Sequence, residues 1–214
     1  MRTYGHFCGV AKALDVLGDR WTLLIVRDLL LGPRRYTDLH VGLPGITTNL
    51  LAKRLREMRD AGLVEKRVEP PPSASTVYVL TDRGRELEPV VLALGRWGAR
   101  YLDAPGDDVT RPRWAMVSLM RRYRGYADGA ANGYTIAYRV GDEPYALRLD
   151  PVRLEVRDGV PVDADLRLSS DAPTFFRLIS RRLGAAALIE SGALRVEGSV
   201  ELLLTLVPAL SLIP

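Results

Sequence analysis

Cysteine and histidine are scarce in this 214-residue sequence, which has one cysteine, Cys8, and two histidines, His6 and His40. A single cysteine excludes an internal disulfide framework and is typical of a protein in a reducing cytoplasm. A structural zinc site needs three or four protein ligands, so two isolated histidines predict no metal site. We expect both histidines to lie at the surface.

Long hydrophobic runs and the common catalytic motifs are also absent. No uncharged apolar run approaches the roughly 18 residues that span a bilayer, and the first residues do not resemble a signal peptide. The sequence contains no glycine-rich phosphate loop, no G-x-S-x-G motif and no metal-ligand spacing. We therefore expect a soluble cytoplasmic protein that is not an enzyme and needs no cofactor.

Acidic residues are outnumbered in the first half of the chain only. Residues 1–104 contain 16 Lys and Arg against 12 Asp and Glu, whereas residues 105–214 contain 14 of each class. The whole formal charge of +4 therefore belongs to the first half. A positive excess confined to one part of a chain is typical of a nucleic-acid-binding domain.

One stretch of this basic half, TTNLLAKRLREMRDAG at residues 47–62, has the pattern of a single helix. Thr47 is a favourable N-cap, Gly62 is a favourable stop, and an apolar stripe recurs at helical spacing through Leu51, Leu55 and Met58. The opposite face is short and polar at first and then basic: Asn49, Ala52, Lys53, Arg56 and Asp60. A helix that enters a DNA major groove needs this layout, although an ordinary solvated helix can have it as well.

The segments before this helix are also predicted to be helical. Residues 8–17 and 20–31 have helical apolar spacing, and we expect Asp19 to be the N-cap of the second, mostly apolar helix. A short helix at residues 36–41 and a turn that contains two glycines lead into residues 47–62. This order of helices predicts a helix-turn-helix.

The segments after it predict a wing and a further helix. Residues 63–68 and 76–80 are rich in Val and Tyr and predict a hairpin. Residues 82–102 have helical apolar spacing on nearly two faces, with a kink expected at Pro89 because proline removes one helical hydrogen bond. The second apolar face indicates a homodimer; the alternative is a helix packed between two domains.

The pattern changes in the second half. Residues 105–113 contain Pro, Gly and charged side chains and predict a linker. A predicted helix at residues 114–126 precedes period-two runs that predict a mainly antiparallel sheet with one apolar face and one face lined with arginine. Asp171 is a favourable helix cap, and a second helix, a last strand and a very apolar helix at residues 200–210 follow.

Five motifs of the first half occur in an order that resembles a known family. They are C-x-V-x-x-A-L-D-V-L-G-D-R-W-T-L-L-I at 8–25, R-Y-T-D-L at 35–39, P-G-I-T at 44–47, L-x-x-R-L-R-E-M-x-x-A-G-L-V at 51–64 and L-T-D-R-G-R-E-L-x-P at 80–89. Over residues 6–102 this order is similar to the HxlR family of bacterial winged-helix regulators. The resemblance implies a homodimeric DNA-binding regulator in which terminal helices form the dimer and the helix at 47–59 enters the major groove.

The resemblance also implies which residues contact DNA. Matched to the helix and the wing of the family, the expected contacts are Thr47, Thr48, Asn49, Ala52, Lys53, Arg54, Arg56, Arg67, Ser73 and Ser75. The wing departs from the family pattern, since residues 70–75 carry no charge where a basic tip is common.

Cys8 is the other position to which the family draws attention, because some relatives use a cysteine there to sense thiol oxidation. A helix start and a nearby cation, Lys12, both favour the thiolate. The alternative is that Cys8 is a small buried hydrophobic residue.

The second half resembles the sterol-carrier-protein-like lipid-binding fold over residues 114–214. The motifs are D-A-D-L-R-L-S-S-D at 163–171, a helix with two phenylalanines, and A-L-I-E-S-G-A-L-R-V-E-G-S at 187–199. The resemblance implies an apolar tunnel lined by Phe175, Phe176, Ile179, Leu188, Leu203, Leu206 and Leu210. The same side chains would also fill an ordinary core.

The sequence thus predicts an α+β protein with three parts: a winged-helix domain at 1–104, a linker at 105–113 and a sterol-carrier-protein-like domain at 114–214. We expect a bacterial transcriptional regulator that binds a pseudo-palindromic operator as a dimer and responds to an apolar ligand. Two alternatives remain. The C-terminal domain is structural only and switching occurs through Cys8 oxidation, or the chain is a lipid carrier.

Overall fold

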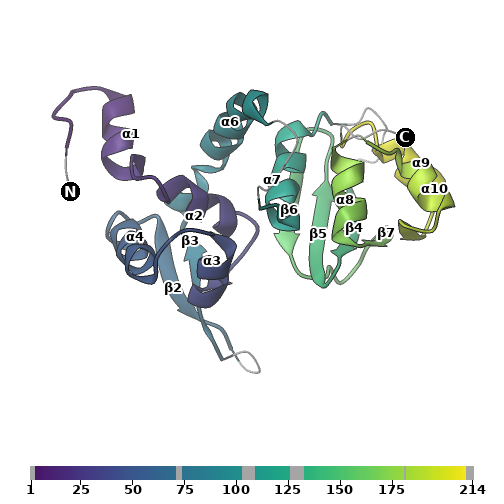
Figure 1. Cartoon of the computed structure of the whole chain (residues 1–214), viewed down its shortest axis with the longest axis horizontal. Coiled ribbons are helices and arrows are strands. Elements are labelled where there is room, and N and C mark those ends of the chain that lie inside the picture. The colour runs from purple at the N-terminus through teal and green to yellow at the C-terminus, as the bar shows by residue number, and fades with distance from the viewer. Residues whose placement is uncertain (1–2, 71–73, 103–108, 126–132, 181, 211–214) are drawn as a thin grey trace. The chain divides into compact units, whose positions relative to one another are not determined.

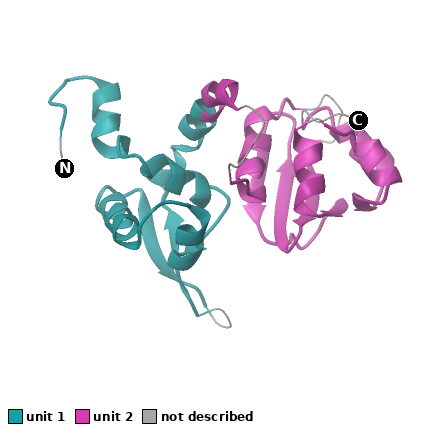
Figure 2. Cartoon of the chain, viewed as in Figure 1, with its two compact units in different colours: residues 1–94 teal, residues 95–214 magenta. Residues whose placement is uncertain are grey.

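The computed structural model describes residues 3–70, 74–102, 109–125, 133–180 and 182–210. Contacts along the chain divide it into two compact units, residues 1–94 and residues 95–214 (Figure 2). We call these the N-terminal unit and the C-terminal unit. Residues 105–108 of the predicted linker lie outside the described residues.

The N-terminal unit combines helices with a small antiparallel sheet in the order β1-β3-β2 (Figure 1). Its elements are α1 (Gly9–Leu17), α2 (Thr22–Leu29), β1 (Arg34–Arg35), α3 (Tyr36–Gly42), α4 (Thr48–Asp60), β2 (Val64–Val68), β3 (Thr76–Leu80) and α5 (Asp82–Arg85). The helices α3 and α4 followed by the β2–β3 hairpin confirm the predicted winged helix-turn-helix. The strand β1 has only two residues and therefore left no periodic pattern in the sequence.

The helix α2 lies in the interior of this unit, as its apolar sequence predicts. Ile25, Val26 and Leu29 are buried, and burial of each such side chain contributes about 1.5–3 kcal/mol. The predicted N-cap at Asp19 is wrong, because the helix begins later, after Trp21. Only the main-chain oxygen of Asp19 takes part in this turn, which leaves its carboxylate available for another contact.

The long helix predicted at residues 82–102 is divided. It consists of α5, then α6 (Glu88–Gly98), and a single 3₁₀ turn, η1 (Ala99–Tyr101). The interruption falls just before Pro89, which lies in the first turn of α6. Backbone N–H groups of a first turn have no partner within the helix, so a proline there breaks no hydrogen bond. The kink expected at Pro89 is therefore confirmed as a break between two helices.

The C-terminal unit contains a five-stranded sheet in the order β6-β5-β4-β7-β8. Its elements are α7 (Pro112–Arg122), β4 (Tyr134–Val140), β5 (Glu143–Leu149), β6 (Leu154–Asp158), β7 (Leu166–Ser170), α8 (Ala172–Ile179), α9 (Ala185–Glu190), β8 (Arg195–Glu197) and α10 (Val200–Leu206). Every pairing is antiparallel except that of β4 with β7. This confirms the prediction of a mainly antiparallel sheet in an α+β protein.

The two faces of this sheet differ as the alternating sequence predicts. Apolar residues on one face are buried, among them Ile136, Leu147, Leu149, Val156 and Leu166. The helices α7 and α8 lie side by side on the sheet (Figure 1). Residues of the opposite parity, including Arg139, Arg148 and Arg167, are exposed.

Helix starts in this unit follow local sequence rules. The carboxylate of Asp171 accepts a hydrogen bond from the backbone N–H of Thr174 at 2.7 Å, which confirms the predicted cap of α8. The helix α7 starts at Pro112, two residues earlier than expected, because proline is well suited to the first helical turn. Arg113, in the same turn, is buried and forms an ion pair with Asp158 of β6.

Candidate nucleic-acid interface

One face of α4 is fixed to the N-terminal unit. At its start the Thr47 hydroxyl accepts a hydrogen bond from the backbone N–H of Leu50 at 3.3 Å. After its end Gly62 adopts a φ of +71°, which a residue with a side chain rarely tolerates. The apolar stripe between these ends is buried and comprises Leu51, Leu55 and Met58. The predicted start, stop and inner face of this helix are all confirmed.

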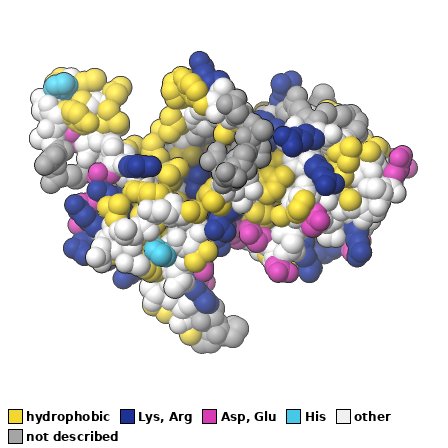
Figure 3. All heavy atoms as spheres, viewed as in Figure 1, with side chains coloured by type: hydrophobic (Ala, Val, Ile, Leu, Met, Phe, Trp, Pro, Cys, Tyr) yellow, Lys and Arg dark blue, Asp and Glu magenta, His cyan; other side chains and the backbone are white. Residues whose placement is uncertain are grey.

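The opposite face of α4 is exposed and carries most of the residues predicted to contact DNA: Thr47, Thr48, Asn49, Ala52, Lys53 and Arg56. Cationic side chains gather over this helix in Figure 3. Lys53 Nζ lies 3.9 Å from Glu57 Oε1 while the lysine side chain is 62% exposed. An exposed pair of this kind contributes about 0–1 kcal/mol, so a DNA phosphate can readily replace the glutamate. Their role as DNA contacts stays a prediction.

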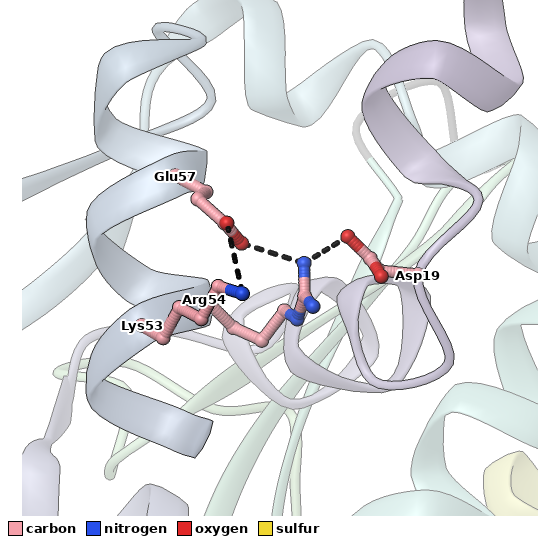
Figure 4. A network of polar contacts seen from close by, with 4 residues as sticks. All are labelled: Asp19, Lys53, Arg54 and Glu57. Carbon is pink, nitrogen blue, oxygen red and sulfur yellow. Dashed lines mark hydrogen bonds and ion pairs between the residues drawn. The ribbon is translucent and has the colours of Figure 1, made fainter. Parts of the chain in front are cut away.

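Arg54 differs from these residues because its side chain is only 11% exposed. Its Nη1 donates to the carboxylate of Asp19 and, at 2.5 Å, to Glu57 Oε2 (Figure 4). The guanidinium group therefore joins α4 to the corner between α1 and α2. Its role as a DNA contact stays a prediction, and these two carboxylate partners favour a role for Arg54 in positioning α4.

A second contact positions the first turn of α4. The hydroxyl of Tyr36, the first residue of α3, donates to the main-chain oxygen of Thr48 at 2.7 Å. This bond connects the two helices of the helix-turn-helix next to the predicted DNA-contacting turn. No pattern in the sequence indicates this bond, because a tyrosine at a helix start has no particular partner until the turn is built.

The wing offers few cations. Arg67 of β2 is exposed, and its Nη2 lies 3.3 Å from Glu69 Oε1. The amino group of Lys66 lies 5.5 Å from the ring centre of Tyr78. Ser75 is half-buried and its main-chain oxygen accepts from the N–H of Glu69 at 2.9 Å, whereas Ser73 lies outside the described residues. Of the predicted wing contacts that the structure describes, Arg67 is therefore the one with an exposed side chain.

Two helical segments expose large apolar side chains. On α1 and the segment before it these are Phe7, Val10 and Leu14, and on α6 and after it they are Val90, Leu94, Trp97, Tyr101 and Leu102. Figure 3 shows hydrophobic side chains gathered over both helices. The rings of Trp97 and Tyr101 lie 5.1 Å apart, so they form one aromatic surface. Several large apolar side chains exposed next to one another are typical of an interaction site.

Cys8 is exposed and immediately precedes α1. The backbone N–H groups of Ala11 and Val10 lower the pKa of its thiol, since they stabilise the thiolate at the helix start. The interpretation of Cys8 as a small buried hydrophobic residue is therefore wrong.

The interior of the C-terminal unit holds a small cavity of about 20 Å³ whose accessible lining is entirely apolar. Four of the residues predicted to line a tunnel contact it: Phe175, Ile179, Leu203 and Leu210. Phe176, Leu188 and Leu206 do not contribute to its lining. A cavity of this size has room for about one water molecule and is too small for a lipid.

The described residues contain no cluster of three or more His, Cys, Asp or Glu side chains that could hold a metal ion. None of the helices in the described part of the chain is long and apolar enough to cross a membrane.

Comparison with known proteins assigns each of the two parts of the chain to a protein family. Residues 16–105 match the HxlR-like helix-turn-helix family, and residues 129–211 match the SCP-2 sterol transfer family. The HTH-type transcriptional regulator sll1512 of Synechocystis sp. is 36% identical over 99 residues, which are 46% of this chain and 73% of that protein. The HTH-type transcriptional regulator YodB of Bacillus subtilis is 34% identical over 98 residues, 46% of this chain and 87% of YodB.

The solved structure of the reduced form of YodB is 32% identical and covers 48% of this chain and 100% of its own, with a TM-score of 0.40. The two family matches confirm both resemblances drawn from the sequence. The matched residues cover more than two thirds of the length of sll1512 and of YodB. The chain therefore belongs to the HxlR-like family of DNA-binding helix-turn-helix transcriptional regulators, and it carries an SCP-2-like domain after the winged helix.

Proposed function

We propose that this regulator binds a pseudo-palindromic operator as a homodimer and places α4 of each protomer in a major groove. The observation that carries the proposal is the exposed face of α4, which has Asn49 in its first turn and Lys53 and Arg56 beyond it. Asn and Arg side chains suit base edges, while Lys suits phosphates. Two such helices related by a two-fold axis would contact half-sites about 34 Å apart. In this proposal the protein acts by binding alone, without catalysis.

The proposed dimer forms through α1 and the segment at residues 82–102. Trp97 is 55% exposed and Leu102 is 76% exposed, and each would gain about 25 cal/mol for every Å² of apolar area that a partner covers. A second copy of the chain carries the same apolar surface, so a two-fold interface would match each patch with its equivalent.

The operator sequence must be identified before binding can be measured. We would select it from a random DNA pool with the full-length protein and then measure affinity at several salt concentrations. Lys53→Ala should reduce the slope of log K against log salt by about 0.9 for each protomer, or about 1.8 for the dimer, and Arg56→Ala should cost about 1–3 kcal/mol in each half-site and relax sequence preference. Arg182→Ala, an exposed arginine of the C-terminal unit, is the matched control and should leave both quantities unchanged. Operator binding by the Lys53→Ala, Arg56→Ala double variant equal to that of the unmodified protein would refute the assignment.

We further propose that an apolar ligand enters the interior of the C-terminal unit and changes operator affinity. The apolar lining of the small interior cavity, shared by the sheet and the helices α8 and α10, supports this step. Since the cavity has about 20 Å³, the ligand must displace these helices. Native mass spectrometry after mild extraction, and thermal shifts with a fatty acid and with a sterol, test the idea. A protein that is always free of ligand and shows no shift would mean that the domain is structural only.

Oxidation of Cys8 is a second candidate for control, and the exposed thiol with a lowered pKa favours it. Because the sequence has no other cysteine, peroxide would oxidise the thiols of two subunits to one intersubunit disulfide, with release of two water molecules. Operator affinity should then change on peroxide treatment in the unmodified protein and stay constant in Cys8→Ser. Equal responses of both proteins would exclude this control.

A further inference from the structure

Three arginines on the exposed face of the C-terminal sheet surround one serine. Arg139 of β4 and Arg195 of β8 are the cross-strand partners of Ser169, which lies on β7 between them. Arg167 precedes Ser169 by two residues and shares its face of β7. Strands are spaced about 4.8 Å apart and alternate residues about 6.8 Å, so the three arginine Cα atoms lie within about 10 Å of one another. Arginine side chains are long enough to converge over Ser169 from these positions.

These side chains line a hollow of about 310 Å³. Small or apolar residues complete its lining, notably Ala137, Pro144 and Val160, and Glu197 is its acidic residue. The volume is at the lower end of the range for small-molecule sites, which is about 300–1,000 Å³. The hollow is separate from the apolar interior of the unit, which lies on the other face of the sheet.

The charges in this hollow are only partly compensated within the protein, because Glu197, the cross-strand partner of Arg167, is its one acidic lining residue. Elsewhere in the same unit Arg113 binds Asp158 and Arg157 binds Glu155. By contrast, the side chains of Arg139, Arg167 and Arg195 make no hydrogen bond or ion pair with any residue that the structure describes. Three guanidinium groups and the single carboxylate of Glu197 leave a net charge of +2 around the hollow. Like charges held close together repel each other, and an anion between them removes that repulsion.

We propose that this hollow binds a small molecule that carries a phosphate group. A phosphate offers three terminal oxygens and up to two negative charges, so it can accept from several guanidinium groups at once, which a carboxylate with two oxygens does less completely. The Ser169 hydroxyl donates to one further oxygen lone pair. Pro144 and Val160 contact the body of the ligand, and Glu197 accepts from a hydroxyl or ammonium group on it.

A compact phosphate compound fits the observations better than the backbone of DNA. Residues 105–214 carry equal numbers of acidic and basic residues, so this half of the chain has no general attraction for a polyanion. Three of its arginines instead line one hollow. The proposal is independent of how α4 binds DNA and of whether the interior of the unit holds an apolar ligand.

Calorimetric titration of the full-length protein at about 0.15 M salt tests the proposal, because exposed charges are then screened beyond about 8 Å. The probes are inorganic phosphate, glycerol 3-phosphate as a soluble phosphate monoester, vesicles that contain phosphatidic acid, and duplex DNA of random sequence. We expect saturable binding of glycerol 3-phosphate with one molecule per chain. Arg167→Ala should weaken it by at least about tenfold, since a charge-assisted hydrogen bond is lost, and Arg167→Lys should restore part of the affinity. Arg182→Ala, on the helical side of the unit, should change it less than twofold.

Three results would overturn the proposal: no saturable binding of either soluble phosphate compound, equal weakening by Arg167→Ala and Arg182→Ala, or binding to vesicles or random DNA alone that Arg167→Ala abolishes. Circular dichroism and the thermal midpoint of each variant show that the fold is retained. Both are expected to be unchanged because Arg167 is exposed.

Discussion

Replacing Arg54 with alanine separates the positioning of α4 from its contact with DNA. The Arg54 side chain is 11% exposed and its Nη1 donates to two carboxylates, whose side chains are 55% exposed in Asp19 and 40% exposed in Glu57. A fully buried charged hydrogen bond contributes about 1.5–3 kcal/mol, and a fully exposed ion pair contributes about 0–1 kcal/mol. With a buried donor and half-exposed acceptors, we expect Arg54→Ala to lower the free energy of unfolding by about 1–2 kcal/mol.

The DNA assay then distinguishes the two roles of this residue. If Arg54 only holds α4, Arg54→Ala weakens operator binding while the slope of log K against log salt stays as in the unmodified protein. Lys53→Ala provides the contrast, because loss of one phosphate contact in each protomer reduces that slope by about 1.8 for the dimer.

Asp19→Ala serves as the partner variant in a double-mutant cycle. It should reproduce most of the effect of Arg54→Ala on stability, and the double variant should add little, which gives a coupling free energy of about 1 kcal/mol. The reasoning is refuted if Arg54→Ala leaves stability unchanged and reduces the salt slope as Lys53→Ala does. Arg54 would then contact phosphate, as the family resemblance implied.

Three further predictions concern single positions of the N-terminal unit and of α6. Thr47→Ala removes the cap of α4 and should cost about 1 kcal/mol in chemical denaturation, whereas Thr47→Ser should cost little. Gly84→Ala would place its Cβ 2.1 Å from the main-chain oxygen of Leu63, so we expect a loss of about 2–4 kcal/mol and a large fall in the thermal midpoint. Trp97→Asp should convert a dimer into a monomer in sedimentation analysis without lowering the thermal midpoint, because Trp97 is exposed within the chain; an unchanged dimer would exclude this surface as the interface.

Local signals in the sequence predicted most of the fold. The caps at Thr47 and Asp171, the stop at Gly62 and the break before Pro89 each depend on a few neighbouring residues, so a pattern could reveal them. The cap assigned to Asp19 failed because the same side chain had a stronger partner in Arg54, 35 residues away. A pattern confined to one helix contains no information about such a partner.

The site residues of the C-terminal unit show a similar limit. Alternation predicted an arginine-lined face, but only the pairing of β4 with β7 and of β7 with β8 places Arg139 and Arg195 on either side of Ser169. The apolar residues of the interior were also predicted as a group. Whether they enclose a tunnel or a cavity of about 20 Å³ depends on packing distances, which residue types alone do not determine.

The parallel pairing of β4 with β7 has a consequence for how the C-terminal unit folds. As the chain leaves the ribosome, β4 can pair with β5 and β5 with β6, but the other edge of β4 stays open until β7 has been made. That open edge belongs to the middle strand and contains Ile136, Tyr138 and Val140, a short hydrophobic stretch able to pair with another chain. A chain cut short between β6 and β7 should therefore aggregate instead of forming a smaller domain.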